Sequence, residues 1–278
     1  MPIVITEDYI RAHLPVLPET AHKGDFGRLG VMAGSYGMAG AAAFAIGAAY
    51  RSGAGLVYGF VPQSIYGILA TICPNAVFYP VDSQEEWKSA QLSRPDAWVI
   101  GCGMGNTEAT AQTAQRLIAL NKPFVLDADG INALAGCIEC SKGKKAVLTP
   151  HEAEAARVLG CSADMVAGNR FSAVQQLAEK SGAVAVLKGH HTLISDRETV
   201  FVCEAGNNGM ATAGSGDVLA GMIGAFLAQG CTPTEAAVMG VYLHARAGDT
   251  AAAQLSRRSL CAMDILAALP EVFKAFEG

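Results

Sequence analysis

The sequence of 278 residues predicts an α/β fold with a mainly parallel sheet and helices on both faces. Apolar runs of strand length alternate with runs of helical length, and small or polar residues follow each predicted strand. Hydrophobic residues make up 51% of the chain and charged residues only 16%, which indicates a heavily buried sheet or subunit contacts. We find no internal repeat, low-complexity tract or linker, so we expect residues 1–278 to form a single domain.

Residues 29–61 predict a βαβ unit. An apolar strand over 29–33 is followed by a loop of small residues over 34–40 and an alanine-rich helix over 41–52. The glycines of Gly-Ala-Gly stop that helix before the next apolar strand, LVYGFV at 56–61. Two strands joined by one helix form a parallel pair in nearly all sheets, and we expect that arrangement here.

The middle of the chain predicts three more strands from short apolar runs. AWVI at 97–100 leads into the loop GCGMGN, and PFVLDADG at 123–130 ends in two carboxylates. The segment AVLTPHEAEAARVLG predicts a strand, a turn and a helix with Pro150 near its first position.

Towards the C-terminus, residues 183–189 predict a strand and residues 191–203 a hairpin that turns at 195–198. The apolar run VLAGMIGAFLAQG predicts a last long helix, buried, with its first turn over 214–218.

The segments after the predicted strands locate a ligand site. In an open α/β sheet, ligands bind where the carboxyl ends of the strands meet. The segments that would gather there are almost entirely small or polar: GSYGMAG, GCGMGN, DADG, TPHE, KGHH and NNGMATAGSGD. We therefore expect one ligand site at this edge of the sheet.

The segment GNNGMATAGSGDVLAG at 206–221 contains a single charged residue, Asp217. Gly214 and Gly216 permit positive φ angles and close approach of another molecule to the main chain. Because the free N–H groups of a helix start attract anions, Gly214, Ser215 and Gly216 predict an anion-binding turn beside a functional Asp217. The alternative is that Asp217 only caps the helix, although a cap alone does not explain the glycines before it.

Composition and charge argue against several classes of partner. The formal net charge is -5 and Lys and Arg form no stripe, so we expect no nucleic-acid partner. The apolar runs 38–50 and 218–228 fall short of the roughly 20 residues that span a membrane, so we expect no membrane partner. The N-terminal sequence carries no export signal, and we expect a cytoplasmic protein whose eight cysteines are free, buried thiols. For the isolated CxxC at 137–140 we expect no metal.

Phosphoryl transfer is the chemistry that these loops suit best. GxxxxGK[ST] is missing, no GxGxxG lies in a strand–turn–helix context, and HEAEA lacks the second histidine of a zinc protease. What remains is an anion-binding helix start, a lysine at a strand end (Lys188) and several carboxylates, which can position and neutralise a phosphoryl group. Asp217 could take the proton from an attacking hydroxyl, and Asp127, Asp129 or Glu154 could reach a hydrated Mg²⁺. The alternatives are a surface lysine and solvated or capping carboxylates.

Linked motifs add a resemblance to a known family. They are ATAGSGDVLAG, similar to (A/G)TGGSGDVLAG; GCGMG, similar to GPGLG; DADGINAL, similar to DADALN; LTPHEAE, similar to LTPHPGE; and VLKGHHT, similar to VLKG-x-x-T. Together with the first βαβ unit, they resemble the ADP-dependent NAD(P)H-hydrate dehydratases of the ribokinase-like superfamily, over residues 24–269. The resemblance implies a ribokinase-like three-layer sandwich.

The resemblance also implies an activity. The S epimer of NADHX or NADPHX, the hydrated reduced nicotinamide cofactors, would be dehydrated back to NAD(P)H by an ADP-dependent hydro-lyase. ADP (or ATP) would phosphorylate the C6 hydroxyl, with AMP as the product released from ADP. Loss of phosphate would then restore the ring double bond, with Mg²⁺ as cofactor.

The roles carried over residue by residue fall into two sets. The nucleotide would contact Lys188, Gly189, His190, His191, Thr192, Gly214, Ser215 and Gly216. The hydrate would contact Ala41, Gly103, Met104, Gly105, His151 and Asp217, with Asp217 as the base.

The sequence departs from the family pattern at three positions. Cys102 replaces a proline, Gly130 a common alanine, and Ala213 a glycine, which would stiffen the anion-binding loop. Some members carry an N-terminal epimerase domain, for which 278 residues leave no room, so we expect a separate NAD(P)H-hydrate epimerase as partner. The family and the apolar composition predict a homo-oligomer, with a tetramer favoured by the resemblance.

Two other functions stay open from the sequence. A ribokinase-like vitamin kinase acting on hydroxymethylpyrimidine or hydroxyethylthiazole would share the GSGD chemistry, but TPHE differs from the TPNxxE of pyrimidine kinases. A catalytically silent nucleotide sensor would have no use for the base Asp217.

Overall fold

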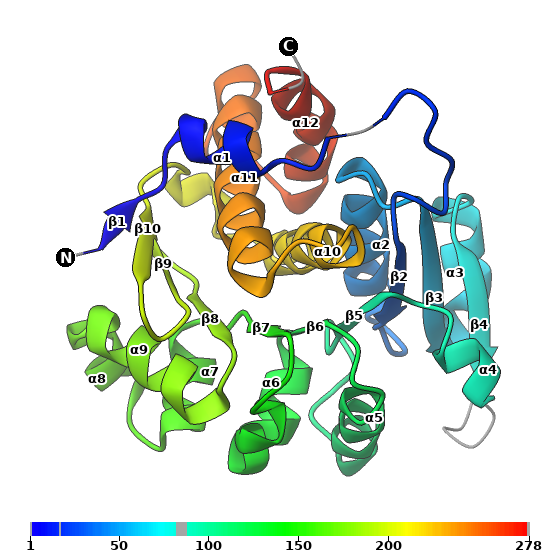
Figure 1. Cartoon of the computed structure of the whole chain (residues 1–278), viewed down its shortest axis with the longest axis horizontal. Coiled ribbons are helices and arrows are strands. Elements are labelled where there is room, and N and C mark those ends of the chain that lie inside the picture. Colours follow the sequence, from blue (N-terminus) through cyan, green and yellow to red (C-terminus); the bar gives the residue numbers. More distant parts are fainter. Residues whose placement is uncertain (1, 17, 82–87, 277–278) are drawn as a thin grey trace.

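The computed structural model describes residues 2–16, 18–81 and 88–276, and these contain a ten-stranded sheet (Figure 1). The strand order is β1-β10-β9-β8-β7-β6-β5-β2-β3-β4. All neighbouring strands are parallel except for the two pairs made by β9, which runs against β8 and β10. The predicted α/β class with a mainly parallel sheet is therefore confirmed.

The strands are short and apolar, and those at the centre of the sheet are buried throughout. Their bounds are β1 Ile3–Val4, β2 Arg28–Met32, β3 Leu56–Pro62, β4 Val77–Val81, β5 Ala97–Ile100, β6 Phe124–Leu126, β7 Ala146–Leu148, β8 Val184–Leu187, β9 Thr192–Ser195 and β10 Val200–Cys203.

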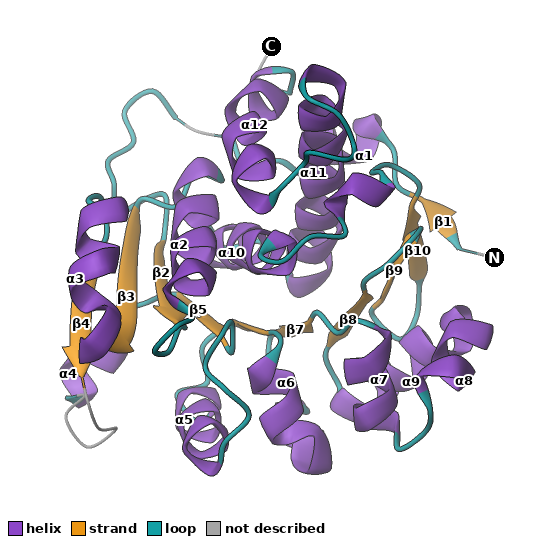
Figure 2. Cartoon of the chain, turned by 180° about the vertical axis from the view of Figure 1, so that it is seen from behind, coloured by secondary structure: helices purple, strands orange, loops and turns teal. Residues whose placement is uncertain are grey.

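Helices cover both faces of the sheet, as the view from behind shows (Figure 2). One face carries α1 Glu7–His13, α2 Ala39–Arg51, α3 Gln63–Ile72, α10 Ser215–Ala228, α11 Pro233–Gln254 and α12 Ala262–Lys274. The other carries α4 Ser89–Leu92, α5 Glu108–Ile118, α6 Asp129–Leu134, α7 Glu152–Leu159, α8 Ala163–Gly168 and α9 Arg170–Ser181. Short 3-10 helices span Ala135–Ser141 and Asn208–Met210. Each face has its own apolar core, which gives the three layers expected from the resemblance.

The chain order reverses between β2 and β5, which lie side by side in the sheet. From β2 the chain proceeds through β3 and β4 in one direction, and from β5 through β6, β7 and β8 in the other. Two hydrogen bonds join the loops that follow these strands: Gly34 N–H donates to the Cys102 carbonyl, and the Ser35 hydroxyl donates to the Gly103 carbonyl, both at 2.8 Å. In open α/β sheets such a reversal marks the ligand-binding edge.

Most predicted elements match the structure to within one or two residues, including the βαβ unit, the hairpin and the buried helix after Gly214. Three details are wrong. The eight free cysteines are not all buried, because Cys137 and Cys261 are exposed. Pro150 lies outside α7, because His151 is the N-cap and Glu152 the first helical residue. The helix that begins at Ser215 is not the last long one, because the 22-residue α11 and then α12 follow it.

Within residues 2–16, 18–81 and 88–276, none of the helices combines the length and the apolar character needed to cross a membrane.

Candidate active site

The N-terminus of α10 lies at the carboxyl edge of the sheet, and no side chain caps it. Gly214 is the N-cap residue, with φ of 91°, and no side chain caps the turn. A Cβ at Gly214 would lie 2.5 Å from the Phe44 ring, so the site requires glycine both for conformation and for space. The Ser215 N–H donates to the Thr212 carbonyl at 3.3 Å, and the N–H groups of Gly216 and Asp217 stay available for an anion. Anion binding by this turn stays a prediction.

Lys188 extends from the end of β8 towards this turn. Its Nζ donates to Asp127 Oδ1 at 2.8 Å and lies 4.0 Å from Glu154 Oε2. A Cβ on Gly216 would lie 3.2 Å from the same ammonium, so Lys188 and the helix start are neighbours. Burial alone would lower the pKa of Lys188, but the charges of Asp127 and Glu154 outweigh it and raise that pKa. Lys188 is thus a charged lysine whose side chain is only 19% exposed.

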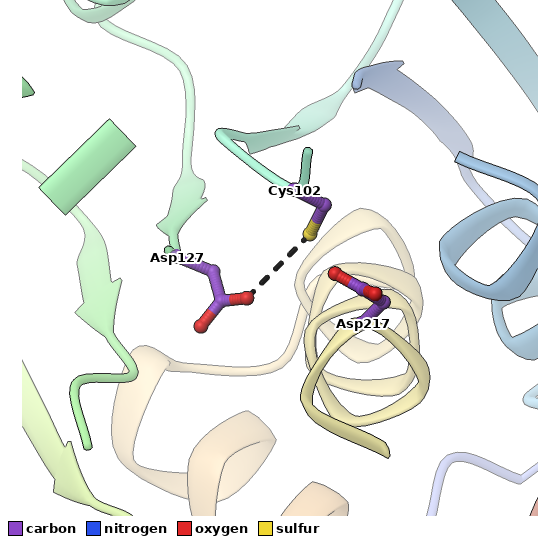
Figure 3. A group of neighbouring side chains, drawn as sticks. All are labelled: Cys102, Asp127 and Asp217. Atoms are coloured by element: carbon purple, nitrogen blue, oxygen red, sulfur yellow. Dashed lines mark hydrogen bonds between the residues drawn. The ribbon is translucent and has the colours of Figure 1, made fainter. Parts of the chain in front are cut away.

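Asp217 lies beside Asp127 and the thiol of Cys102 (Figure 3). The ligand atoms of these three side chains all lie within 4.8 Å of one another, and Cys102 Sγ donates to Asp127 Oδ2 at 3.6 Å. Burial, with the nearby charge of Asp127, raises the pKa of Asp217 to about 6. Burial also raises the pKa of the Cys102 thiol well above its usual range, so Cys102 is a neutral donor. A carboxylate whose pKa approaches neutrality suits proton transfer.

Backbone strain separates the two carboxylates of DADG. Ala128, between them, has a φ of 48°, which is costly for a residue with a Cβ. As a result Asp127 enters the buried cluster, where Thr149 Oγ1 donates to it at 2.6 Å. Asp129 turns away and accepts the Gly105 N–H at 2.7 Å.

The three carboxylates predicted to reach a metal do not converge on one point. Asp127 is bonded by Lys188 and faces Asp217, Asp129 holds the Gly105 loop, and Glu154 accepts the His151 N–H at 2.9 Å. Among the described residues, Asp127 joins Cys102 and Asp217 in the group of potential metal-binding side chains, whereas Asp129 and Glu154 do not. Because these oxygens are largely taken by protein donors, the donor set fits a Mg²⁺ that keeps its waters and not a dedicated protein cage.

His151 has a visible structural task. Its Nδ1 accepts hydrogen bonds from the N–H groups of Ala153 at 3.1 Å and Glu154 at 3.3 Å. The Glu154 carboxylate in turn accepts a hydrogen bond from the His151 N–H. This is a capping box with histidine in place of Ser or Thr. Half of the imidazole stays exposed, with Nε2 3.2 Å from Glu154 Oε1. His151 therefore has a structural role as the cap of α7, and a contact between its exposed part and a ligand stays a prediction.

Part of the set predicted for the hydrate lies together on the α2 side of the site. A Cβ at Gly103 would lie 2.8 Å from the Ala41 Cβ, which places the two residues in contact. Gly103 and Gly105 both have positive φ, and the half-buried Met104 packs against the core below them. The loop after β5 therefore packs against the first turn of α2.

The predicted nucleotide loop, residues 189–192, continues outward from Lys188. Gly189 has a φ of 140°, and its missing side chain leaves room for the Arg170 guanidinium. His190 and His191 are exposed, and their rings stack with centroids 3.9 Å apart. Thr192 Oγ1 donates to the Gly189 carbonyl at 3.0 Å and closes the turn.

Sequence reasoning missed four side chains around the site. Arg170 donates to the carbonyls of Leu187 and Lys188 and pairs with Glu152, which fixes the end of β8. The others are Thr149, the thiol of Cys102 as a hydrogen-bond donor, and His244 of α11, whose Nε2 lies 3.3 Å from Ser215 Oγ. In the sequence, the position of His244 within the apolar run of α11 could have indicated a buried, hydrogen-bonded histidine.

A cavity of about 300 Å³ lies at the opposite edge of the sheet, before β7 and β8. Its lining includes Lys144, Gly182, Asp196 and Arg197, and it contains none of the predicted site residues. It has no part in the site described above.

The fold and the site together define a ribokinase-like protein: a parallel sheet between helical layers, with an open helix start, a lysine and an aspartate at its carboxyl edge. A family model described as NAD(P)H-hydrate dehydratase matches residues 29–271. The chain therefore belongs to the NAD(P)H-hydrate dehydratase family.

Individual relatives agree with this assignment. The chain is 42% identical over 239 residues to an ADP-dependent (S)-NAD(P)H-hydrate dehydratase of Neisseria meningitidis, covering 83% of this chain and 79% of that protein. It is 40% identical to a bifunctional NAD(P)H-hydrate repair enzyme of Coxiella burnetii over 90% of this chain, but spans only 52% of that longer relative.

Solved structures place the fold in the same group. The ADP/ATP-dependent NAD(P)H-hydrate dehydratase of Bacillus subtilis, co-crystallised with ATP/Mg²⁺, is 28% identical with a TM-score of 0.86 and covers 99% of this chain and 98% of its own. A hydroxyethylthiazole kinase of Pyrococcus horikoshii is 18% identical with a TM-score of 0.61, over 83% of this chain and 96% of its own, and shares the fold alone.

Proposed function

We propose that this protein is an ADP-dependent (S)-NAD(P)H-hydrate dehydratase, a hydro-lyase that converts NADHX and NADPHX back to NADH and NADPH. The observation that carries the proposal is the meeting of Asp217, Lys188 and the open first turn of α10 at the edge of the sheet. Family membership and the Neisseria relative support the substrate.

In the proposed reaction, the residues of the site act in two steps. The first-turn N–H groups of α10 and the Lys188 ammonium would bind the phosphoryl group while Asp217 takes the proton from the C6 hydroxyl of the hydrate. The hydroxyl oxygen would form a bond to the β-phosphorus of ADP as the bond to AMP breaks. The C6–O bond would then break, phosphate would leave with the oxygen, and loss of the C5 proton would restore the ring double bond.

Mg²⁺ would shield the nucleotide phosphates during the transfer, as the B. subtilis structure with ATP/Mg²⁺ suggests for a relative. We propose that Asp127, Asp129 and Glu154 reach the ion through its water molecules, because each of these carboxylates already accepts a hydrogen bond from the protein.

The other assigned residues complete the proposal. The exposed His190 and His191 rings and the Gly189–Thr192 turn would border the adenine nucleotide. Ala41, Gly103, Met104 and Gly105 would form the surface beneath the hydrate. His151 would offer its exposed edge to the hydrate in addition to capping α7.

The direct test mixes the purified protein with NADHX and ADP and follows the dihydronicotinamide absorbance band. The proposal predicts recovery of NADH that requires ADP. A vitamin kinase would instead phosphorylate hydroxymethylpyrimidine or hydroxyethylthiazole and leave NADHX unchanged. A nucleotide sensor would bind ADP with no turnover of either substrate.

We also propose the surroundings in which this enzyme works. All eight cysteines are free, and free thiols are typical of a reducing compartment such as the cytoplasm. Exposed Ile68 and Ile72 on α3, beside Val77 on the edge strand β4, are consistent with a homo-oligomer, for which we favour a tetramer. We propose that residues 1–278 form one domain and that a separate epimerase supplies the S epimer. Light scattering on the purified protein tests the subunit number.

A further inference from the structure

A buried histidine contacts the first turn of α10. His244, in the middle of α11, is only 8% exposed, and its Nε2 lies 3.3 Å from the hydroxyl of Ser215, which is equally buried. Ser215 is the first residue of α10 and follows the uncapped Gly214. The Ser215–His244 pair therefore connects α11 to the first turn of α10, which no side chain caps.

The imidazole is uncharged at neutral pH. Burial lowers the pKa of His244 to about 4, and the positive charge of Lys188 contributes in the same direction. A neutral imidazole has one N–H donor and one acceptor nitrogen, and a hydroxyl can pair with either. It also adds no second positive charge near the helix start, beside which the Lys188 ammonium already lies.

A buried imidazole is costly in this position. The surrounding residues of α11, among them Val241, Leu243 and Ala245, are buried and apolar, and an apolar side chain would pack there without loss of hydration. The hydrogen bond to Ser215 compensates that cost, and it also orients the Ser215 hydroxyl.

We propose that His244 is a positioning residue for phosphoryl transfer: it holds the Ser215 hydroxyl so that this hydroxyl and the first-turn N–H groups of α10 face the phosphates of the bound nucleotide. The proposal rests on the proposed function in its choice of ligand. His244 itself does not touch substrate and acts through Ser215.

The test is a double-mutant cycle on ADP affinity, measured by calorimetry, with the variants His244→Leu, Ser215→Ala and both together. We expect each single variant to bind ADP about three- to tenfold more weakly, the loss that one hydrogen bond produces. The double variant should be no weaker than the weaker single variant, because both changes remove the same interaction. Losses that simply multiply would overturn the proposal.

A conservative variant separates positioning from packing. The amide nitrogen of a glutamine can occupy the place of Nε2, so His244→Gln should recover most of the ADP affinity that His244→Leu loses. Equal losses in both variants, or an unchanged affinity in Ser215→Ala, would contradict the proposal. Should His244→Leu fail to fold, the Ser215→Ala and His244→Gln affinities still decide it.

Calorimetry with ADP needs no NADHX, so its outcome is independent of whether the protein dehydrates the hydrate. In turnover with NADHX, the same variants should raise the KM for ADP and leave the KM for the hydrate unchanged. A parallel rise of both constants would indicate a general structural role and count against the proposal.

Discussion

Two causes raise the pKa of Asp217 to about 6: first the burial of its carboxyl group, and then the negative charge of the neighbouring Asp127. As a base it acts only when ionised, so kcat/KM for the hydrate should fall about tenfold per pH unit well below pH 6. A pH profile of kcat/KM measures this limb. A limb near the ordinary value for Asp would show that another group is the base.

The same shift has a consequence for stability. A raised folded-state pKa means that neutral Asp217 stabilises the fold at pH values below the ordinary 3.8, and this stability is lost as the pH rises through about 6. The variant Asp217→Asn should therefore melt at a higher temperature than the wild type at pH 8, although its turnover falls by about two to four orders of magnitude. More than a tenth of wild-type turnover would exclude Asp217 as the base.

Lys188 is paired with Asp127 and lies beside Gly216, so its ammonium is placed to bind nucleotide phosphates. Lys188→Ala should weaken ADP binding by about tenfold or more, which is the loss expected when a charge-assisted hydrogen bond is removed. The affinity for the hydrate should change much less. The matched control is Lys180→Ala, which removes a lysine bonded to the Val158 carbonyl at the far edge of the sheet. Equal ADP affinity in the two variants would refute the role of Lys188.

His151 can be separated into its two roles by substitution. His151→Ala removes the cap of α7 and should cost about 1 kcal/mol of unfolding free energy. His151→Ser restores a cap and should recover the melting temperature. If the imidazole also contacts the hydrate, the KM for the hydrate should stay raised in both variants. A normal KM in His151→Ser would leave capping as the whole of its role.

At the scale of the elements, the helix start of α10 depends on Gly214. An alanine there would combine a φ of 91° with a Cβ 2.5 Å from the Phe44 ring. Gly37 offers a matched control, since its φ is 84° and nothing lies within 4 Å of its would-be Cβ. Gly37→Ala should cost about 1 kcal/mol from the backbone alone, and Gly214→Ala about 1–3 kcal/mol more. Equal losses in chemical denaturation would show that the contact with Phe44 is unimportant.

The elements that the sequence predicted best are those with strong local signals. The strands around Val31, Val99 and Val125 are apolar runs bounded by glycine or proline, and such runs form strands wherever a parallel sheet buries them. Helix α11 was not predicted, because its run from Ala236 to Ala247 is buried on nearly every side and shows no amphipathic period.

The sequence predicted where the site lies in the fold, but it did not predict which side chains contact one another there. Parallel strands bring their following loops to one edge whatever the loop sequences are, so Asp127, Lys188 and Asp217 were expected to lie near one another. The bond between Lys188 and Asp127 joins residues 61 positions apart, and the orientation of each side chain depends on the strained Ala128 and on burial. His244 belongs to a helix that carries no motif, so only the folded structure brings it into contact with Ser215.

At the scale of the whole molecule, the ten-stranded sheet places a helix start, an ammonium and a carboxylate from distant parts of the chain at one edge. The central claim is that the C6 hydroxyl is phosphorylated and then leaves as phosphate. NADHX prepared in water enriched in a heavy oxygen isotope carries that isotope in its C6 hydroxyl. With ADP and this protein, we expect one AMP and one phosphate for each NADH, with the heavy oxygen in the phosphate. Recovery of NADH with the heavy oxygen in water instead would contradict the account.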